Sequence, residues 1–348
     1  MIWLTWRQFR GGAVMMAVAL AALAAILGLT GPGLADEYST GISACTAQGG
    51  GCSDFVEDFL NDNQIPHLAV TAVVLVLPAL IGVFRGTPLI AREIEAGTHR
   101  LVWNQSITRT RWLAVKLGLT GLAAMTAAGL GSLAVTWWSS PLDKTATEFP
   151  RMAPLLFAAR GIVPIGYAAF AFALGVTVGT LVRRTLPAMA ITLAVFVAAQ
   201  IAMPLLVRPH LLAPTRSTIE ITASNVSGFH WANDDVLVEA NATSADAWVL
   251  SSHIEDPSGH AIGAISVPSS SGPCASPPTD AEEYTDPGDD PYVAACLAEI
   301  QRLGYRLHTT YHPASRFWPF QWYEAGIYTA LALGLAGFCS WQIRRRPS

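Results

Sequence analysis

Long apolar stretches alternate along the chain with short polar segments that carry most of the charge. A helix needs roughly 20 mainly apolar residues to cross the hydrocarbon core of a bilayer. Six stretches reach or approach that length, at about 12–30, 67–84, 113–138, 155–182, 186–207 and 322–343. The pattern predicts an all-α polytopic membrane protein with six transmembrane helices.

The polar segments divide the expected protein into three parts. Residues 1–207 would hold the first five spans, and residues 319–348 would form the sixth span with a basic tail. Between them, residues 208–318 are the only stretch long enough for a soluble subdomain.

Within 208–318, Val, Ile, Thr and Trp alternate with polar residues, as is typical of short strands. This alternation occurs around 217–222, 235–240 and 246–254. Residues 266–291 are rich in Pro, Ser, Gly and Asp and favour an irregular loop. Residues 292–304 form an amphipathic pattern that ends at Gly304 and predicts a short helix. We expect a small mixed α/β or irregular subdomain.

Composition supports the membrane assignment. Hydrophobic residues make up 52% of the chain and charged residues only 13%, whereas soluble domains carry about a quarter charged residues. We therefore expect a lipid bilayer as the surroundings of this chain and no nucleic-acid partner.

Thirteen of the 21 Lys and Arg residues lie in segments that six spans place on one side. They are Arg7, Arg10, Arg85, Arg92, Arg100, Arg109, Arg111, Lys116, Arg183, Arg184, Arg344, Arg345 and Arg346. Because Lys and Arg concentrate in cytoplasmic loops, both termini are predicted to be cytoplasmic and 208–318 extracytoplasmic. The chain would then be a multi-pass protein of the cell membrane. A five-span arrangement would place one of the arginine clusters outside.

Two details of the spans need interpretation. Arg7 and Arg10 before the first apolar run resemble the start of a signal peptide, but the run is longer than the usual 7–15-residue core. We interpret it as a retained span. Arg160 lies near one end of the fourth span, where its side chain is expected to reach the interface.

The cysteines divide between the expected sides. Cys45 and Cys52 lie in the first outside loop, and Cys274 and Cys296 lie in the large outside segment. Even numbers on an oxidising face predict disulfides. We expect Cys45–Cys52 and Cys274–Cys296, although the sequence does not exclude the crossed pairing. Cys339 stands alone in the last span and is expected to be a packing residue.

The sequence lacks several motifs that are typical of nucleotide-binding sites and of enzymes. There is no P-loop, no H-E-x-x-H zinc motif and no G-x-S-x-G nucleophile elbow. His308 and His312 are four residues apart, but Pro313 disfavours a helix there, and we expect no metal site. The chain is therefore not expected to be an enzyme or to hold a cofactor. Glu324 is the one acid in or beside a span, and it serves either an interfacial hydrogen bond or a transport role.

The segment between the second and third spans has the signals of two short helices. Thr87 can cap a helix that has Pro88 at its first position, and Gly97 can end it. A second short helix would cover 99–104. The polar face bears charges of both signs, on Arg92, Glu93, Glu95 and Arg100. Mixed signs favour a protein partner over anionic lipid alone, and the alternative is a self-contained helix with Arg–Glu pairs.

These residues resemble a pattern in the permease subunits of six-span ABC exporters. Arg92-Glu93, Gly97-Thr98, Leu101, Thr108-Arg109 and Lys116 stand in the order found there. Ser106 stands near the place where that family often has a proline, so the shape of the turn differs. The closing stretch YHPASRFWPFQWYEAGIY is similar to a subset of such permeases common in actinobacteria.

The resemblance implies a division of labour. A separate ABC ATP-binding subunit would dock on residues 92–104 of the cytoplasmic coupling loop 85–111, and the permease would pair with itself or with a paralogue to enclose a path. The implied coupling residues are Arg92, Glu93, Glu95, Gly97, Thr98, His99, Arg100, Leu101 and Trp103. The start of the chain would form an interfacial helix through Trp3, Trp6, Arg7 and Arg10. The alternative function is a multi-span sensor or binding protein that uses the acidic outside segment.

Overall fold

The computed structural model describes residues 2–47, 52–95, 109–145, 151–232, 235–240, 247–275 and 291–345. The chain forms two compact units. The helical unit comprises Met1–Thr145, Ala153–Leu211 and Phe317–Ser348, and the sheet unit comprises Ala146–Met152 and Leu212–Arg316. Each unit is considered separately.

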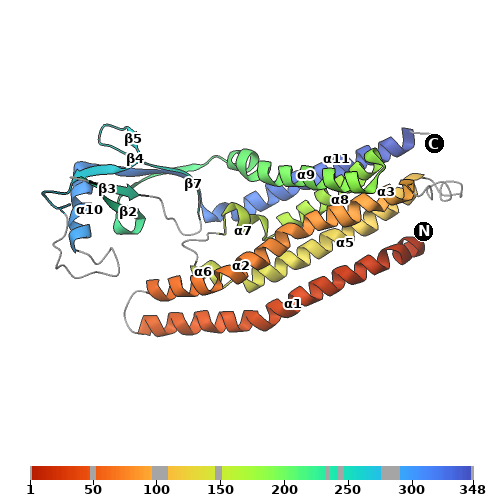
Figure 1. Ribbon diagram of the computed structural model, residues 1–348, viewed down its shortest axis with the longest axis horizontal. Helices are drawn as coiled ribbons and strands as arrows, with labels where there is room; N and C mark the ends of the chain where they lie inside the picture. Colours follow the sequence, from red (N-terminus) through yellow and green to blue (C-terminus); the bar gives the residue numbers. More distant parts are fainter. Residues whose placement is uncertain are drawn as a thin grey trace. The chain divides into compact units, whose positions relative to one another are not determined.

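The helical unit is built mainly of long helices (Figure 1). Its long helices are α1 (Ile2–Ala47), α2 (Ser53–Ile81), α5 (Arg109–Trp138), α8 (Val163–Val182), α9 (Thr185–Ala202) and α11 (Phe317–Arg345). Shorter helical pieces are the π-helix η1 (Gly82–Gly86), α3 (Thr87–Glu95), α6 (Leu142–Thr145), α7 (Pro154–Ala158), the π-helix η2 (Met203–Val207) and the 3₁₀ turn η3 (Arg208–His210).

Five helices of the described chain are long and apolar enough to cross a membrane. They cover Arg10–Ala47, Asp54–Arg92, Ala114–Trp138, Val163–Val182 and Thr185–His210. The stretch predicted as a sixth span lies in α11, which is 29 residues long but is not among them. Gln321, Glu324 and several aromatic residues lower its apolar character. The protein is thus a multi-pass membrane protein, while six spans and cytoplasmic termini stay predictions.

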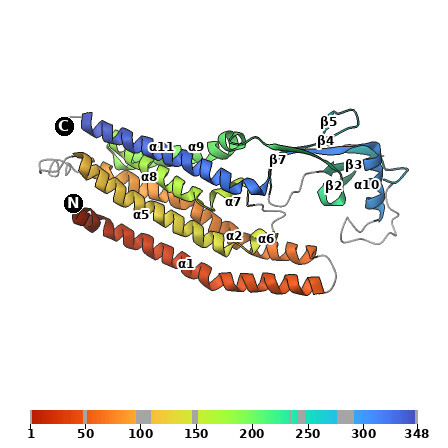
Figure 2. The same ribbon diagram turned by 180° about the vertical axis from the view of Figure 1, so that it is seen from behind.

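Helix α8 lies at the centre of the helical unit. It contacts α2, η1, α3, α5, α9 and α11, and Figures 1 and 2 show the long helices running beside it. Its side chains are buried from Val163 to Thr180 almost without interruption. A helix that is apolar all round is a buried helix, and the run of Ala, Gly, Val and Phe in α8 fits that position.

Four glycines bring η1 and α3 against the backbone of α8. A Cβ atom added to Gly175 would lie 2.3 Å from the carbonyl oxygen of Gly82, and one added to Gly82 would lie 2.6 Å from that of Ala171. Gly86 and Gly179 are equally close to the opposite backbone. Two G-x-x-x-G pairs therefore face each other, since only glycine allows helix backbones to approach so closely.

The stretch after α2 is not a loop that starts a new helix. Helix α2 continues through η1 into α3, so the predicted helix start at Thr87 was wrong. Thr87 has helical backbone angles, and its hydroxyl donates to the carbonyl of Gly82 at 3.2 Å. Pro88 has no N–H, which leaves a preceding carbonyl free. The wider π-helical turn just before it accommodates that loss.

Two other predicted boundaries differ from the structure. The interfacial helix and the first span form one helix, α1, that runs through Pro32 to Ala47. The predicted span 155–182 is interrupted, because α7 ends at Ala158 and α8 begins only at Val163. Gly161 in this turn has a φ of +65°, a conformation that favours glycine.

The described residues of the sheet unit form two antiparallel sheets and one α-helix. The first sheet has the order β1 (Thr215–Glu220), β7 (Arg306–His312), β4 (Trp248–Glu255), β5 (Ala261–Ile262). The second has the order β2 (Val226–Ala232), β3 (Asp235–Ala240), β6 (Ile265–Pro268). Helix α10 (Pro291–Leu303) and the 3₁₀ turns η4 (Ala223–Asn225) and η5 (Ala314–Arg316) complete it.

Alternate residues of β3 and β6 point into the core of this unit. Val236, Val238, Ile265 and Val267 are buried there with residues of α10, β4 and β7. The disulfide Cys274–Cys296 lies in the same core and ties α10 to the segment after β6. In the helical unit, Cys45 is joined to Cys52. Both predicted pairings are confirmed, and Cys339 is a free, buried thiol.

We expect Gly175→Ala to destabilise the protein because the new methyl group meets the Gly82 carbonyl, which is backbone and cannot swing away. Overpacking of this kind costs about 1–3 kcal/mol, which for a chain of 348 residues lowers the unfolding midpoint by roughly 1–4 °C. Thermal unfolding of the detergent-purified chain measures it. Gly334→Ala in α11, where a Cβ meets nothing within 4 Å, is the control. Equal midpoints for the two variants would contradict the close contact.

Candidate functional site

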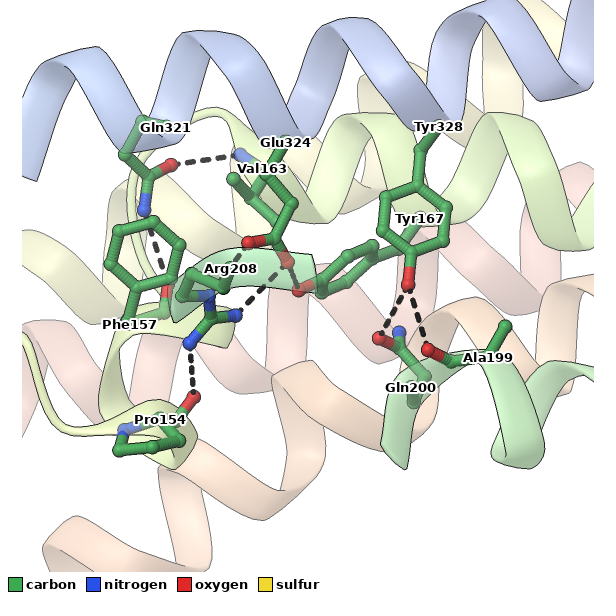
Figure 3. A network of polar contacts seen from close by, with 10 residues as sticks. All are labelled: Pro154, Phe157, Val163, Tyr167, Ala199, Gln200, Arg208, Gln321, Glu324 and Tyr328. Atoms are coloured by element: carbon green, nitrogen blue, oxygen red, sulfur yellow. Dashed lines mark hydrogen bonds and ion pairs between the residues drawn. The ribbon is translucent and has the colours of Figure 1, made fainter. Parts of the chain in front are cut away.

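A buried ion pair joins the end of α9 to α11. Arg208 in η3 and Glu324 in α11 have exposed fractions of 1% and 0%. The guanidinium Nε lies 2.8 Å from Glu324 Oε2, and Nη2 lies 3.0 Å from Oε1 (Figure 3). Two parallel hydrogen bonds of this kind are the strongest form of Arg–carboxylate contact.

The remaining polar atoms of the pair also have partners. The Tyr167 hydroxyl in α8 donates to Glu324. Arg208 Nη1 donates to the carbonyl of Pro154 at 3.5 Å, and the guanidinium lies 4.2 Å from the centre of the Phe157 ring. Buried charges cost free energy unless hydrogen bonds satisfy them. Here α7, α8, η3 and α11 each supply one or more of these contacts.

Gln321 and Tyr328 extend the network along the same face of α11. Gln321 Oε1 accepts hydrogen bonds from the backbone N–H groups of Ile162 and Val163, both at 3.0 Å, and its Nε2 donates to the Phe157 carbonyl at 3.1 Å. The Tyr328 hydroxyl donates to the carbonyl of Ala199 in α9 at 3.2 Å. We call Tyr167, Arg208, Gln321, Glu324 and Tyr328 the α11 network.

The spacing of the network residues along α11 explains why their side chains meet. Residues 321, 324 and 328 are separated by one helical turn each and therefore share one face of α11. That face lies against α8, where the Tyr167 ring meets the Tyr328 ring edge-on at 4.7 Å. Figure 3 shows Tyr167 from α8, Arg208 from η3 and Glu324 from α11 pointing toward one another. Glu324 is thus a buried link between helices.

A second buried arginine lies in the turn between α7 and α8. Arg160 is 2% exposed and forms an ion pair with Asp143 in α6. Its Nη2 lies 2.8 Å from Nε2 of His67 in α2. The sequence predicted that Arg160 reaches the membrane interface, and this was wrong because a carboxylate and a histidine partner are available inside the unit.

The residues expected to couple to an ATPase fall partly in α3. Arg92, Glu93 and Glu95 lie in its last two turns, and Arg92 is exposed. Gly97, Thr98, His99, Arg100, Leu101 and Trp103 lie outside the described residues. Of the expected interfacial residues, Trp3, Trp6 and Arg7 are in the first turns of α1, and Arg10 is exposed.

Helix α3 is fixed to α9 as well as to α8. The Glu95 carboxylate accepts a hydrogen bond from the Thr185 hydroxyl at 2.6 Å and a longer one from the Thr185 N–H at 3.4 Å. Thr185 is the first residue of α9, where free N–H groups and the helix dipole favour an anion. The hydroxyls of Thr87 and Thr192 are 3.2 Å apart. Ile90 and Ala91 are buried between these contacts.

The chain matches one known protein family over much of its length. The family described as ABC-2 membrane transporter related matches residues 17–208, more than half of the chain. The chain belongs to this ABC-2 family. A search of curated proteins and one of solved structures find no match. The family supports an ABC transporter permease of the ABC-2 type, and such permeases in general act with an ATP-binding subunit.

The region matched to the ABC-2 family runs from α1 to Arg208 and includes η1, α3 and α8. It stops before α11, which supplies Glu324. The α11 network therefore ties the matched part of this ABC-2 permease to its last helix. Among the described residues, no group of three or more His, Cys, Asp and Glu side chains could hold a metal ion. His308 and His312 both lie in β7.

In this ABC-2 permease, Glu324→Leu should cost about 3–5 kcal/mol of stability because Arg208 keeps its buried charge without its partner. The double variant Arg208→Leu/Glu324→Leu should cost clearly less than the sum of the two single variants. Thermal and denaturant unfolding in detergent measure this cycle. Strictly additive effects would show that the two side chains do not depend on each other.

Proposed function

We propose that the chain is the membrane-spanning subunit of an ATP-driven ABC exporter and forms the translocation path. ATP hydrolysis takes place on a separate subunit, since the chain has no P-loop. The end of α3 and both termini face the cytoplasm, where that subunit docks. This orientation rests on the positions of the arginines.

The contacts that fix α3 to α8 and α9 are the main support for this proposal. The backbone carbonyl of Thr87, the first residue of α3, lies against Gly179 of α8, and the two ends of α3 are bonded to α9 at Thr192 and Thr185. A force applied to the end of α3 therefore reaches two spans without passing through a flexible joint. An ATP-binding subunit needs such a stiff connection to change the conformation of the permease.

The contacts divide the charged residues of α3 into two groups. Glu95 binds Thr185 within the chain, so we assign it to the internal link. Arg92 and Glu93, with the stretch 96–104 that follows α3, are assigned to docking of the ATP-binding subunit. In this division, docking and transmission use neighbouring residues of one helix.

Two spans support pairing with a second permease, either the same chain or a paralogue. In the apolar window of α1 only 11% of residues are buried, and in that of α9 only 17%, against 83% for α8. Large apolar side chains such as Leu29 and Leu186 are at least 80% exposed. In the proposed dimer the second permease covers part of these faces, and lipid covers the rest.

The sheet unit is proposed to lie outside the cell. Its disulfide and the Cys45–Cys52 disulfide fit an oxidising compartment. The acidic segment that contains α10 fits the same side, because positive charge favours the cytoplasm.

Charge reversal separates docking from transmission. Glu93→Lys should reduce co-purification with the ATP-binding subunit by more than tenfold, since the reversed charge opposes the proposed docking contact. Thr185→Val should leave co-purification intact but lower the permease-dependent stimulation of ATP turnover, because the shorter of the two hydrogen bonds from α9 to Glu95 is lost. The assay is pull-down with ATPase measurement in liposomes.

Glu299→Lys in α10 is the control, because Glu299 pairs only with the exposed Arg302 of its own helix among the described residues. It should alter neither quantity. If Glu93→Lys binds and stimulates the ATPase like the wild type, the docking assignment fails. If the wild-type chain neither binds nor stimulates it, the sensor or binding function is favoured instead.

A further inference from the structure

An apolar groove lies in the helical unit between α1, η1 and α5. It has a volume of about 370 Å³, within the range of ligand sites. Helix α1 lines it from Gly12 to Leu20, and α5 lines it from Leu119 to Leu130. At about 1.5 Å of rise per residue, these segments are roughly 12–16 Å long. Figure 2 shows α1 and α5 running alongside each other.

The shape of the groove indicates which kind of ligand it can bind. The groove runs along two helices over that length, and every residue of its lining except Arg85, Thr120 and Thr126 is apolar. It fits a single extended hydrocarbon chain.

The two ends of the groove differ in polarity. Arg85 in η1 is the one charged residue of the lining. Its guanidinium lies beside Gly12, at the position that a Cβ of residue 12 would occupy. The opposite end is lined by Leu20 and Leu130. Charge at one end and aliphatic walls along the rest match an amphiphile with an anionic head.

Arg85 is available for such a head. Within the part of the chain that the structure describes, no acidic side chain forms an ion pair with it. Its side chain is half-buried, at the end of the groove next to Gly12. We propose that the groove binds one phospholipid with an anionic headgroup, its acyl chain between α1 and α5 and its phosphate against Arg85.

Lipid retention tests this site without any ATP-binding subunit, so its result is independent of the proposed transport function. The full chain in a neutral detergent is mixed with phosphatidylglycerol or phosphatidylcholine of the same acyl chains, and bound lipid is counted by native mass spectrometry. The wild type should prefer phosphatidylglycerol. Arg85→Gln should lower the affinity for phosphatidylglycerol about five- to tenfold and that for phosphatidylcholine less, because the choline cation offsets the charge of its phosphate. Ala123→Phe, which fills the groove, should reduce both lipids.

Two matched controls make the outcome decisive. Arg184→Gln removes an exposed arginine outside the groove, and Ala330→Phe adds the same ring to an exposed position of α11. Neither should change retention. Equal retention of the two lipids by the wild type, an undiminished preference in Arg85→Gln, or the same loss in Arg184→Gln would each overturn the proposal. Full retention by Ala123→Phe would overturn the placement of the acyl chain.

Discussion

The contact between two pairs of glycines sets the arrangement of the helical unit. Gly82 and Gly86 face Gly175 and Gly179, and the backbones are so close that a single added carbon at Gly175 would lie 2.3 Å from a carbonyl oxygen. In a membrane, where lipid is as apolar as the helices, close packing of this kind drives association. It joins α2, η1 and α3 to α8, and the buried position of α8 then determines which faces of the other helices remain for packing.

The buried polar contacts fix how the packed helices are aligned along one another. Apolar side chains can slide over one another, whereas the pairing of Arg208 with Glu324 and of Gln321 with the α7–α8 turn fixes α11 in one register. Arg160 fixes the other side of the same turn to α2 and α6. The two buried arginines thus hold α8 at its start, and Thr87 and Glu95 hold the two ends of α3 against α9. A stiff element that connects both ends of the bundle is what the proposed coupling requires.

Sequence reasoning recovered the features that depend on one segment at a time. Apolar length predicts α1, α5 and α9, because crossing a bilayer demands it, and cysteine number and position predict both disulfides. Features that depend on distant partners were missed. Gly175-x-x-x-Gly179 is visible in the sequence, but nothing in it names Gly82 and Gly86 as the opposite surface. Thr87-Pro88 has the signature of a helix start, yet the π-helix before it lets the helix continue. Arg208 was placed at the edge of a soluble segment, since its partner Glu324 is 116 residues away.

The central claim is that η1, α3 and α8 move as one body when the proposed ATP-binding subunit acts. Spin labels at Phe84 in η1 and Leu181 in α8, both exposed positions, report the distance between these elements by pulsed electron paramagnetic resonance. In the reconstituted complex, the distance distribution should be the same without nucleotide and with bound ATP, while the distance between the two Phe84 labels of a permease pair changes. A shift of the Phe84–Leu181 distance by a helical turn, about 5 Å, would contradict the claim.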